Sequence, residues 1–407
     1  MIMRERPKYY IGIDTHKFTH TACVMNYDTD SLLSLTFENA PSEYEEALNK
    51  ILDVTKTDSI IFGLEDVNSC GLLFSRYLDE KGYIVKYVNP TLPSTIRKNS
   101  SNYRKTDEYD AYCVARVLKD DYKRLPNFRY EQVFTNIRTL ANRRNLLTEQ
   151  KGTNYQQLHQ QIMKLYPEYT KFFSELQTRC ALTFYRRFPS SRFLEGYNCE
   201  TLVKEMKGLT RIFTEAMATR ILSANVITYV DEIVENIIID LIDDIYDKEE
   251  KIKKLEKQLE VLIKKTGYQL ETIPGVSTAI ASNLISVIGN IERFKSEKQL
   301  ANFCGVAPVT IGSGGKSIEQ SSKGGHRELR STFYNMALGM ISVNKNGNAR
   351  YPMYRGYYLK KLQEGKSGTQ AMVCIMRQLV RLVHSMMKNK TEWKTPVHEE
   401  KVQSIEI

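Results

Sequence analysis

The sequence predicts a multidomain protein of mixed α/β and α class, with an N-terminal α/β domain, long central helices and a mainly helical C-terminal domain. Strand-like and helical segments alternate over residues 9–130. The strand signal then ends, and apolar residues three and four positions apart continue to residue 265. Because 407 residues at 42% hydrophobic content exceed what one core usually serves, two or three domains are expected. The predicted parts are residues 1–130, 131–265 with a helical insert near 168–228, 266–390, and a flexible tail at 391–407.

The N-terminal part is expected to form a layered α/β domain. The apolar run Tyr9–Ile13 ends on Gly-Ile-Asp and, after a polar turn, continues into Thr21–Met25, which indicates a hairpin. Such an alternation predicts mixed strand directions. The further elements are strands at Leu32–Phe37, Ser59–Leu64 and Ile84–Val88 and helices at Ser42–Val54 and about 69–81.

The middle of the chain is expected to form two long helical arms with coiled-coil seams around the insert. The stronger seam consists of Ile238, Leu241, Ile245, Ile252, Leu255, Leu259 and Leu262, with Lys248 at one position. The weaker seam consists of Val133, Ile137, Leu140, Leu147, Leu158, Ile162 and Leu165, interrupted by Arg144, Lys151 and Asn154. No function is predicted for the insert.

Positive charge is concentrated in the C-terminal domain. Residues 266–390 hold 17 Lys and Arg against six Asp and Glu, a net charge of +11, while the whole chain carries +10. A local excess of this kind attracts a polyanion by counterion release, so the charge favours nucleic acid over a merely soluble basic surface. Seven scattered cysteines without CxxC spacing, and no apolar run near the roughly 20 residues of a membrane span, predict a cytoplasmic protein without leader or membrane contact.

Four acidic residues are predicted to form a metal site. Asp14 and Glu65 each close a strand, and Asp107 and Asp110 lie three residues apart on one helix face. Because adjacent carboxylates repel unless a cation neutralises them, the cluster favours Mg²⁺ or Mn²⁺. Two such ions can activate the attacking oxygen and stabilise the leaving oxygen at a phosphodiester. The structural alternative is that these acids are turn residues and helix caps. The nearby histidines are interpreted as turn or substrate-facing residues, because a hard cation prefers oxygen: His16 and His20.

A glycine-flanked serine is the second candidate catalytic feature. Ser313 lies in Ile-Gly-Ser-Gly-Gly-Lys, where the absence of neighbouring side chains lets a scissile phosphate approach the hydroxyl. Three basic residues downstream are predicted to balance charge during its attack: Lys316, Arg327 and Arg330. The plain alternative is a flexible Gly/Ser turn.

A Pro-Gly motif precedes an apolar helix in the same domain. Pro274-Gly275-Val276 resembles a helix-hairpin-helix turn, whose exposed backbone amides can hold a DNA phosphate, although it can also be a simple connector. No helix-turn-helix or zinc-finger base reader is recognised. The residues predicted to bind nucleic acid are Lys105, Arg143, Arg144, Lys151, Gly275, Lys316, Lys323, Arg327 and Arg330.

The order of these motifs resembles the insertion-sequence one-ten (IS110) family of transposases, the Piv/MooV-type DEDD recombinases. The matching segments are Ile11-Gly-Ile-Asp14, Gly63-Leu-Glu65, Lys105-Thr-Asp-Glu-Tyr-Asp110, the Pro-Gly-Val and Gly-x-x-Pro segments, and Ser313-Gly-Gly-Lys. The resemblance implies a RuvC-like ribonuclease H fold at the N-terminus, carrying the DEDD acids. It also implies a catalytic serine that becomes joined to DNA, here Ser313, with Ser317, Ser321 and Ser322 close enough to remain alternatives.

The resemblance further implies a structured non-coding bridge RNA that pairs with donor and target DNA. Strand exchange needs several cuts at once, so a homodimer or homotetramer is expected, and the acid site and the serine would meet between protomers. Two other functions stay open at this point. One is a RuvC-like junction nuclease that uses only metal and water, and the other is a nucleic-acid-binding scaffold without catalysis.

Overall fold

The computed structural model of the chain divides into two compact units. It describes residues 6–65, 70–99, 106–224, 231–313, 316–321 and 325–394. One unit is built from both ends of the chain, Met1–Arg138 and Val261–Ile407, and the other is Thr139–Glu260. The predicted N-terminal and C-terminal domains thus belong to one unit, and most of the predicted helical arms belong to the other. Within the described residues, no helix is both long and apolar enough to cross a membrane.

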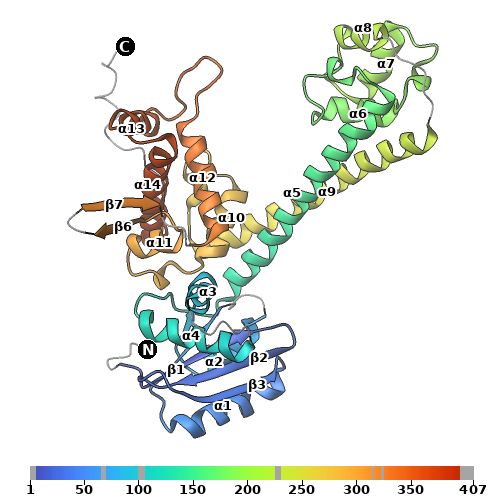
Figure 1. Ribbon diagram of the computed structural model, residues 1–407. Helices are drawn as coiled ribbons and strands as arrows, with labels where there is room; N and C mark the ends of the chain where they lie inside the picture. The colour runs from blue at the N-terminus through green and yellow to red at the C-terminus, as the bar shows by residue number, and fades with distance from the viewer. Residues whose placement is uncertain are drawn as a thin grey trace. The chain divides into compact units, whose positions relative to one another are not determined.

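A five-stranded mixed sheet forms the N-terminal part of the first unit (Figure 1). Its order is β3 (Ser31–Glu38), β2 (Thr19–Met25), β1 (Tyr9–Thr15), β4 (Ile60–Leu64) and β5 (Val85–Tyr87). The first three strands are antiparallel neighbours, whereas β1, β4 and β5 are parallel. The predicted hairpin and the mixed α/β class are therefore confirmed.

Helices cover both faces of this sheet. Helices α1 (Pro41–Thr55) and α2 (Leu72–Glu80) pack on one face, and α4 (Asp107–Asp121) packs on the other, near α3 (Thr91–Lys98). Side chains alternate between the faces along each strand. In β1, Ile11 and Ile13 join the core under α1 and α2. Tyr10 joins the core under α4.

A glycine in the central strand β1 allows α4 to lie close to the sheet. A Cβ atom added to Gly12 would lie 2.2 Å from the carbonyl oxygen of Ala111 and 2.3 Å from the backbone nitrogen of Ala115. Both atoms belong to the α4 backbone and cannot move aside as a side chain would. The absence of a side chain at Gly12 therefore sets the distance between the sheet and the helix that carries Asp107 and Asp110.

Gly12→Ala is expected to lower the free energy of unfolding by about 3 kcal/mol or more, because overpacking against backbone forces the helix off the sheet. Urea denaturation would measure the change. The matched control is Gly152→Ala, where an added Cβ meets nothing within 4 Å in the middle of a helix. That control should stabilise its helix by roughly 1 kcal/mol. Equal stability of Gly12→Ala and the wild type would contradict the close packing of α4.

Two long helices dominate the second unit, as predicted. They are α5 (Gln132–Leu165) and α9 (Glu232–Thr266). Three contacts join them: Arg144 pairs with Glu256 at 3.0 Å, Lys151 with Glu249 at 3.3 Å, and the Asn154 amide donates to Asp244 at 3.1 Å. The helices run antiparallel, because the residue numbers of the partners fall along α9 as they rise along α5. The polar residues that interrupt the predicted seam are therefore cross-helix partners. The insert between the helices contains α6 (Arg179–Arg187), α7 (Cys199–Leu209) and α8 (Glu215–Ser223) around an aromatic core.

The C-terminal part of the first unit is mainly helical, with one addition that the sequence analysis did not predict. Its helices are α10 (Thr278–Ile288), α11 (Glu297–Phe303), α12 (Arg327–Ile341), α13 (Pro352–Gln363) and α14 (Gly368–Asn389). The addition is a two-stranded antiparallel sheet of β6 (Pro308–Ser313) and β7 (Lys316–Ser321). Ser313 therefore ends one strand of a two-stranded sheet. The missed signal was the Gly-Gly pair between two runs with β-branched residues.

Candidate active site

Side chains alternate between the two faces of the sheet, and this alternation places the acid in β1 and the acid after β4 on the face covered by α4. In β1, Asp14 has the same parity as Gly12, which faces α4. Glu65 follows the end of β4 directly, beside β1 in the parallel register. The helix begins with Asp107, and the Thr106 hydroxyl caps it by accepting a hydrogen bond from the backbone amide of Tyr109 at 3.2 Å. Two strand ends and one helix start therefore converge at one edge of the domain.

A histidine lies between two of these acids. The His16 Nε2 atom is 3.1 Å from Asp14 Oδ2 and 3.4 Å from Asp107 Oδ1. One ligand atom from each of these three residues lies within 4.8 Å of the others, a spacing at which they could hold a cation. His16 is therefore part of the acid cluster, whereas the sequence analysis interpreted it as a turn or substrate-facing residue. His20 differs from its prediction as well, because it is fully buried between the rings of Phe37 and Phe74.

The fourth acid has a cationic partner. Asp110 forms an ion pair with Arg97, which lies near the end of α3, and both side chains are largely buried. The Asp107 side chain is 60% exposed. Of the two acids on this helix face, one is thus fixed by an arginine and the other is open to solvent. The sequence offered no signal for Arg97, because its pairing depends on how α3 packs on α4.

The acids at the strand ends bear an electrostatic cost that a cation would relieve. Burial raises the pKa of Asp14, and the charges of Asp110 and Asp107 raise it further, while His16 partly offsets both. Burial also raises the pKa of Glu65 to about 7, with additional repulsion from Asp14 and Asp110. Buried carboxylates that repel one another are typical of sites for hard divalent cations. The residues present therefore fit the Mg²⁺ or Mn²⁺ that the sequence predicts.

Glu65 is expected to make divalent-cation binding and stability depend on pH. Because its pKa is about 7, Mg²⁺ must displace a proton from Glu65 at lower pH, so Mg²⁺ affinity should fall between pH 8 and pH 6. In metal-free protein the sign is opposite: stability from protonated Glu65 is complete below its unfolded pKa and is lost as the pH rises through 7. Calorimetric Mg²⁺ titrations and thermal melts from pH 5 to 8 would measure both effects. Glu65→Gln should flatten both profiles, and the control Glu43→Gln, a half-exposed acid in the first turn of α1, should not. Unchanged profiles in Glu65→Gln would refute the assignment.

The predicted nucleophile lies at the end of a strand. Ser313 is the last residue of β6 and pairs in register with Lys316, the first residue of β7. The hairpin is a separate sheet from the one that bears Asp14 and Glu65. Gly314 and Gly315, which follow Ser313 in the sequence, lie outside the described part of the chain. Ser317 and Ser321 belong to β7, and Ser322 lies outside the described residues.

The residues predicted to bind nucleic acid have different surroundings. Arg144 and Lys151 are partly buried in ion pairs with α9, and Arg143 is exposed on α5. Gly275 has a φ of +80°, as a turn before α10 requires. Arg327 and Arg330 lie in the first turn of α12, with Arg327 exposed. Their contacts with nucleic acid stay predictions, and two residues of the set lie outside the described residues: Lys105 and Lys323.

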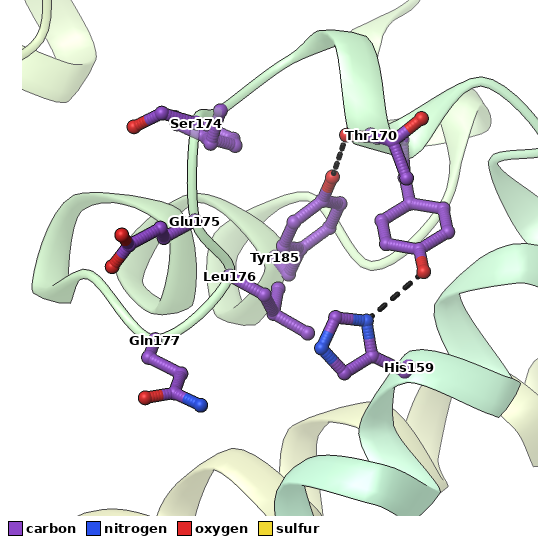
Figure 2. A pocket seen from close by; sticks show the side chains of 9 residues that line it. His159, Thr170, Ser174, Glu175, Leu176, Gln177 and Tyr185 are labelled. Carbon is purple, nitrogen blue, oxygen red and sulfur yellow. Dashed lines mark hydrogen bonds between the residues drawn. The ribbon is translucent and has the colours of Figure 1, made fainter. Parts of the chain in front are cut away.

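The second unit contains a pocket of its own in the insert (Figure 2). The His159 Nδ1 atom lies 2.9 Å from the hydroxyl of Tyr169, and the hydroxyl of Tyr185 donates to the carbonyl oxygen of Tyr169 at 3.4 Å. The other lining residues are Thr170, Phe173, Ser174, Glu175, Leu176 and Gln177. Because no lysine or arginine lines it, this pocket lacks the charge that a phosphate site needs.

Comparison with known families covers both ends of the first unit. Residues 11–167 match the DEDD transposase model of the IS110 type, and residues 267–352 match the model of the transposase IS116/IS110/IS902 family. The chain belongs to the IS110 family of transposases. The resemblance predicted from the motifs is thereby confirmed. As an IS110-family member, the chain is a transposase that acts on DNA, and its DEDD-type domain is consistent with use of a divalent metal.

Two relatives of this IS110-family transposase align with nearly its whole length. The insertion element IS116 44.8 kDa protein of Streptomyces clavuligerus is 23% identical over 94% of this chain and 95% of its own length. The insertion element IS900 42 kDa protein of Mycobacterium paratuberculosis is 21% identical over 93% of this chain and 96% of its own. The pilin gene-inverting protein of Moraxella lacunata is 33% identical over 132 residues, which are 32% of this chain and 39% of that protein.

Proposed function

We propose that this transposase cuts and rejoins DNA through a covalent intermediate on Ser313, assisted by a divalent cation at its acid cluster. The observation that carries the proposal is the convergence of Asp14, His16 and Asp107 within 4.8 Å at the edge of the sheet. The second support is the glycine-flanked serine at the end of β6, in a sheet separate from the one that bears Asp14. A pilin gene-inverting protein among the relatives is consistent with recombination as well as transposition.

The acid cluster is proposed to hold Mg²⁺ or Mn²⁺ in a RuvC-like domain. An acid on the first strand, another after the fourth and a pair on a later helix agree with the arrangement that the resemblance implies. Asp14 and Asp107 would bind the ion directly, with His16 beside them, and Glu65 would join them once deprotonated. Arg97 holds Asp110 in place. A bound divalent cation would supply Lewis-acid stabilisation of negative charge at the phosphodiester.

Ser313 is proposed to be the nucleophile. Its Oγ forms a bond to phosphorus as the bond from phosphorus to a deoxyribose oxygen breaks, and the hydroxyl proton passes to a base while the leaving oxygen gains a proton. The resulting phosphodiester preserves the bond energy, so attack by a hydroxyl of another strand restores the serine and joins the DNA. Lys316, Arg327 and Arg330, from β7 and α12, are the cations proposed to balance charge.

A bridge RNA is proposed to select the donor and target sites, and the working form is proposed to be a homodimer or homotetramer in the cytoplasm. Protein purified without nuclease from cells carrying the element should retain one discrete structured RNA encoded by that element. Sequencing the copurified nucleic acid measures this directly. The matched sample is the same protein expressed without the element's non-coding flanks. Recombination by RNA-free protein would contradict RNA guidance while leaving the serine chemistry intact.

A further inference from the structure

A groove of about 600 Å³ lies in the first unit between its N-terminal and C-terminal parts. One wall contains Tyr87, at the end of β5, and the segment after α4 with Lys123 and Arg124. The other wall contains Lys295 and α11 with Lys298. The groove is separate from the acid cluster and from the serine hairpin. None of the residues predicted to bind nucleic acid lines it.

The walls of the groove are held together by specific contacts. The Gln299 side chain donates from Nε2 to the carbonyl oxygen of Arg124 at 2.7 Å and accepts at Oε1 from the backbone amide of Lys295 at 2.8 Å. The rings of Tyr87 and Phe303 meet edge to face, with centroids 5.9 Å apart. The groove is therefore a preformed feature, because both walls share a hydrogen-bonded and packed junction.

The charge in the groove is strongly positive and largely uncompensated. Its lining includes four cations, and the acid among the lining residues, Asp121, is already engaged by Arg124 at 3.3 Å. Within the described part of the chain, no carboxylate pairs with Lys123, Lys295 or Lys298. Four cations with a single acid among them favour an anionic ligand, which supplies the missing counter-charge.

A buried lysine strengthens this charge from behind the groove. Lys86 in β5 is 8% exposed, and its Nζ donates to the carbonyl oxygen of Leu125 at 3.0 Å. Burial and the nearby charge of Lys295 lower the pKa of Lys86 to about 8. An anion bound in the groove would raise the pKa of Lys86, because it would offset the charge of Lys295. Lys86 and Lys295 thus belong to one electrostatic site.

We propose that this basic groove, lined by Lys123, Arg124, Lys295 and Lys298, binds the phosphodiester backbone of the nucleic acid on which the transposase acts. The inference rests on the proposed function and adds a binding site to it. Lysines and an arginine contact phosphates, while the half-buried rings of Tyr87 and Phe303 offer a surface for sugar or base. Because both walls contribute cations, a bound nucleic-acid strand would lie across the junction between the N-terminal and C-terminal parts of the first unit.

The test is the double variant Lys123→Gln/Lys298→Gln, measured by fluorescence anisotropy with labelled duplex DNA, single-stranded DNA and an RNA hairpin. At about 0.1 M salt we expect at least tenfold weaker binding of the nucleic acid that occupies the groove. The slope of the logarithm of the binding constant against the logarithm of the salt concentration should fall in magnitude by about two, one for each lost phosphate contact. The three probes distinguish DNA from RNA. The charge-matched control is Lys50→Gln/Lys81→Gln, on α1 and after α2, where both lysines pair with exposed glutamates.

Three outcomes separate the inference from the function on which it rests. If Lys123→Gln/Lys298→Gln binds nucleic acid as tightly as the wild type, the groove is not the binding site. An equal loss of binding in the groove variant and the control variant would overturn the assignment as well. Wild-type protein that binds none of the probes overturns the proposed function itself. Lys123→Arg/Lys298→Arg keeps the charge, so its retained binding would show that positive charge is the property required. Thermal melts of each variant exclude misfolding as the cause of the loss.

Discussion

Ser313→Ala is expected to abolish the covalent protein–DNA adduct and to reduce recombination by at least about 10³-fold, because no hydroxyl remains at that position to attack the phosphodiester. The adduct would be detected with radiolabelled donor DNA as a band that survives denaturation and disappears after proteolysis. Ser313 ends a strand whose backbone pairs with Lys316. Alanine can keep that pairing, so the variant should fold normally.

The matched controls for this serine lie on the partner strand. Ser317→Ala and Ser321→Ala remove hydroxyls from β7 and should leave the adduct in place. An adduct that persists in Ser313→Ala but disappears in Ser317→Ala would move the nucleophile to β7. Wild-type protein that nicks DNA without any adduct would instead support a nuclease that uses metal and water alone. Each result therefore selects one of the mechanisms compatible with the fold.

The N-terminal domain could be predicted closely because its sequence signals are local. Apolar runs bounded by turn residues marked the strands, and a hydrophobic strand that ends on an acid marked Asp14 and Glu65. Because Asp14 and Glu65 each close a strand, the sequence also predicted that these acids could converge. The long helices α5 and α9 were equally clear from their apolar spacing.

The parts that could not be predicted depend on contacts between distant residues. The pairing of Arg97 with Asp110 requires the packing of α3 on α4, which no local pattern encodes. The position of His16 between two acids depends on the turn after β1 and on the start of α4. Arg144 and Lys151, which interrupt the apolar seam of α5, likewise form ion pairs with acids on α9 that the sequence pattern did not indicate. Long-range polar partners are therefore where sequence reasoning reached its limit.

Asp14→Asn is expected to reduce strand cleavage by at least about 10³-fold while leaving the metal-free protein as stable as the wild type or more stable. The substitution preserves shape but removes a carboxylate that a divalent cation needs. The expected gain in stability follows from the raised pKa of Asp14, which shows that burial and the charges of Asp110 and Asp107 disfavour its ionised form. DNA-nicking assays and thermal melts with and without Mg²⁺ would measure both changes.

Opposite effects on activity and stability distinguish a metal ligand from a structural acid. Mg²⁺ should raise the melting temperature of the wild type but not of Asp14→Asn, because a ligand stabilises only a fold that binds it. Asp53→Asn, on the exposed side of α1, is the charge-matched control and should keep both the cleavage and the Mg²⁺ shift. If Asp14 were only a turn residue, Asp14→Asn would still cleave DNA, and Mg²⁺ would change the melting temperatures of the variant and the wild type equally. That result would leave the serine hairpin without its metal partner and would favour a binding scaffold over an enzyme at this site.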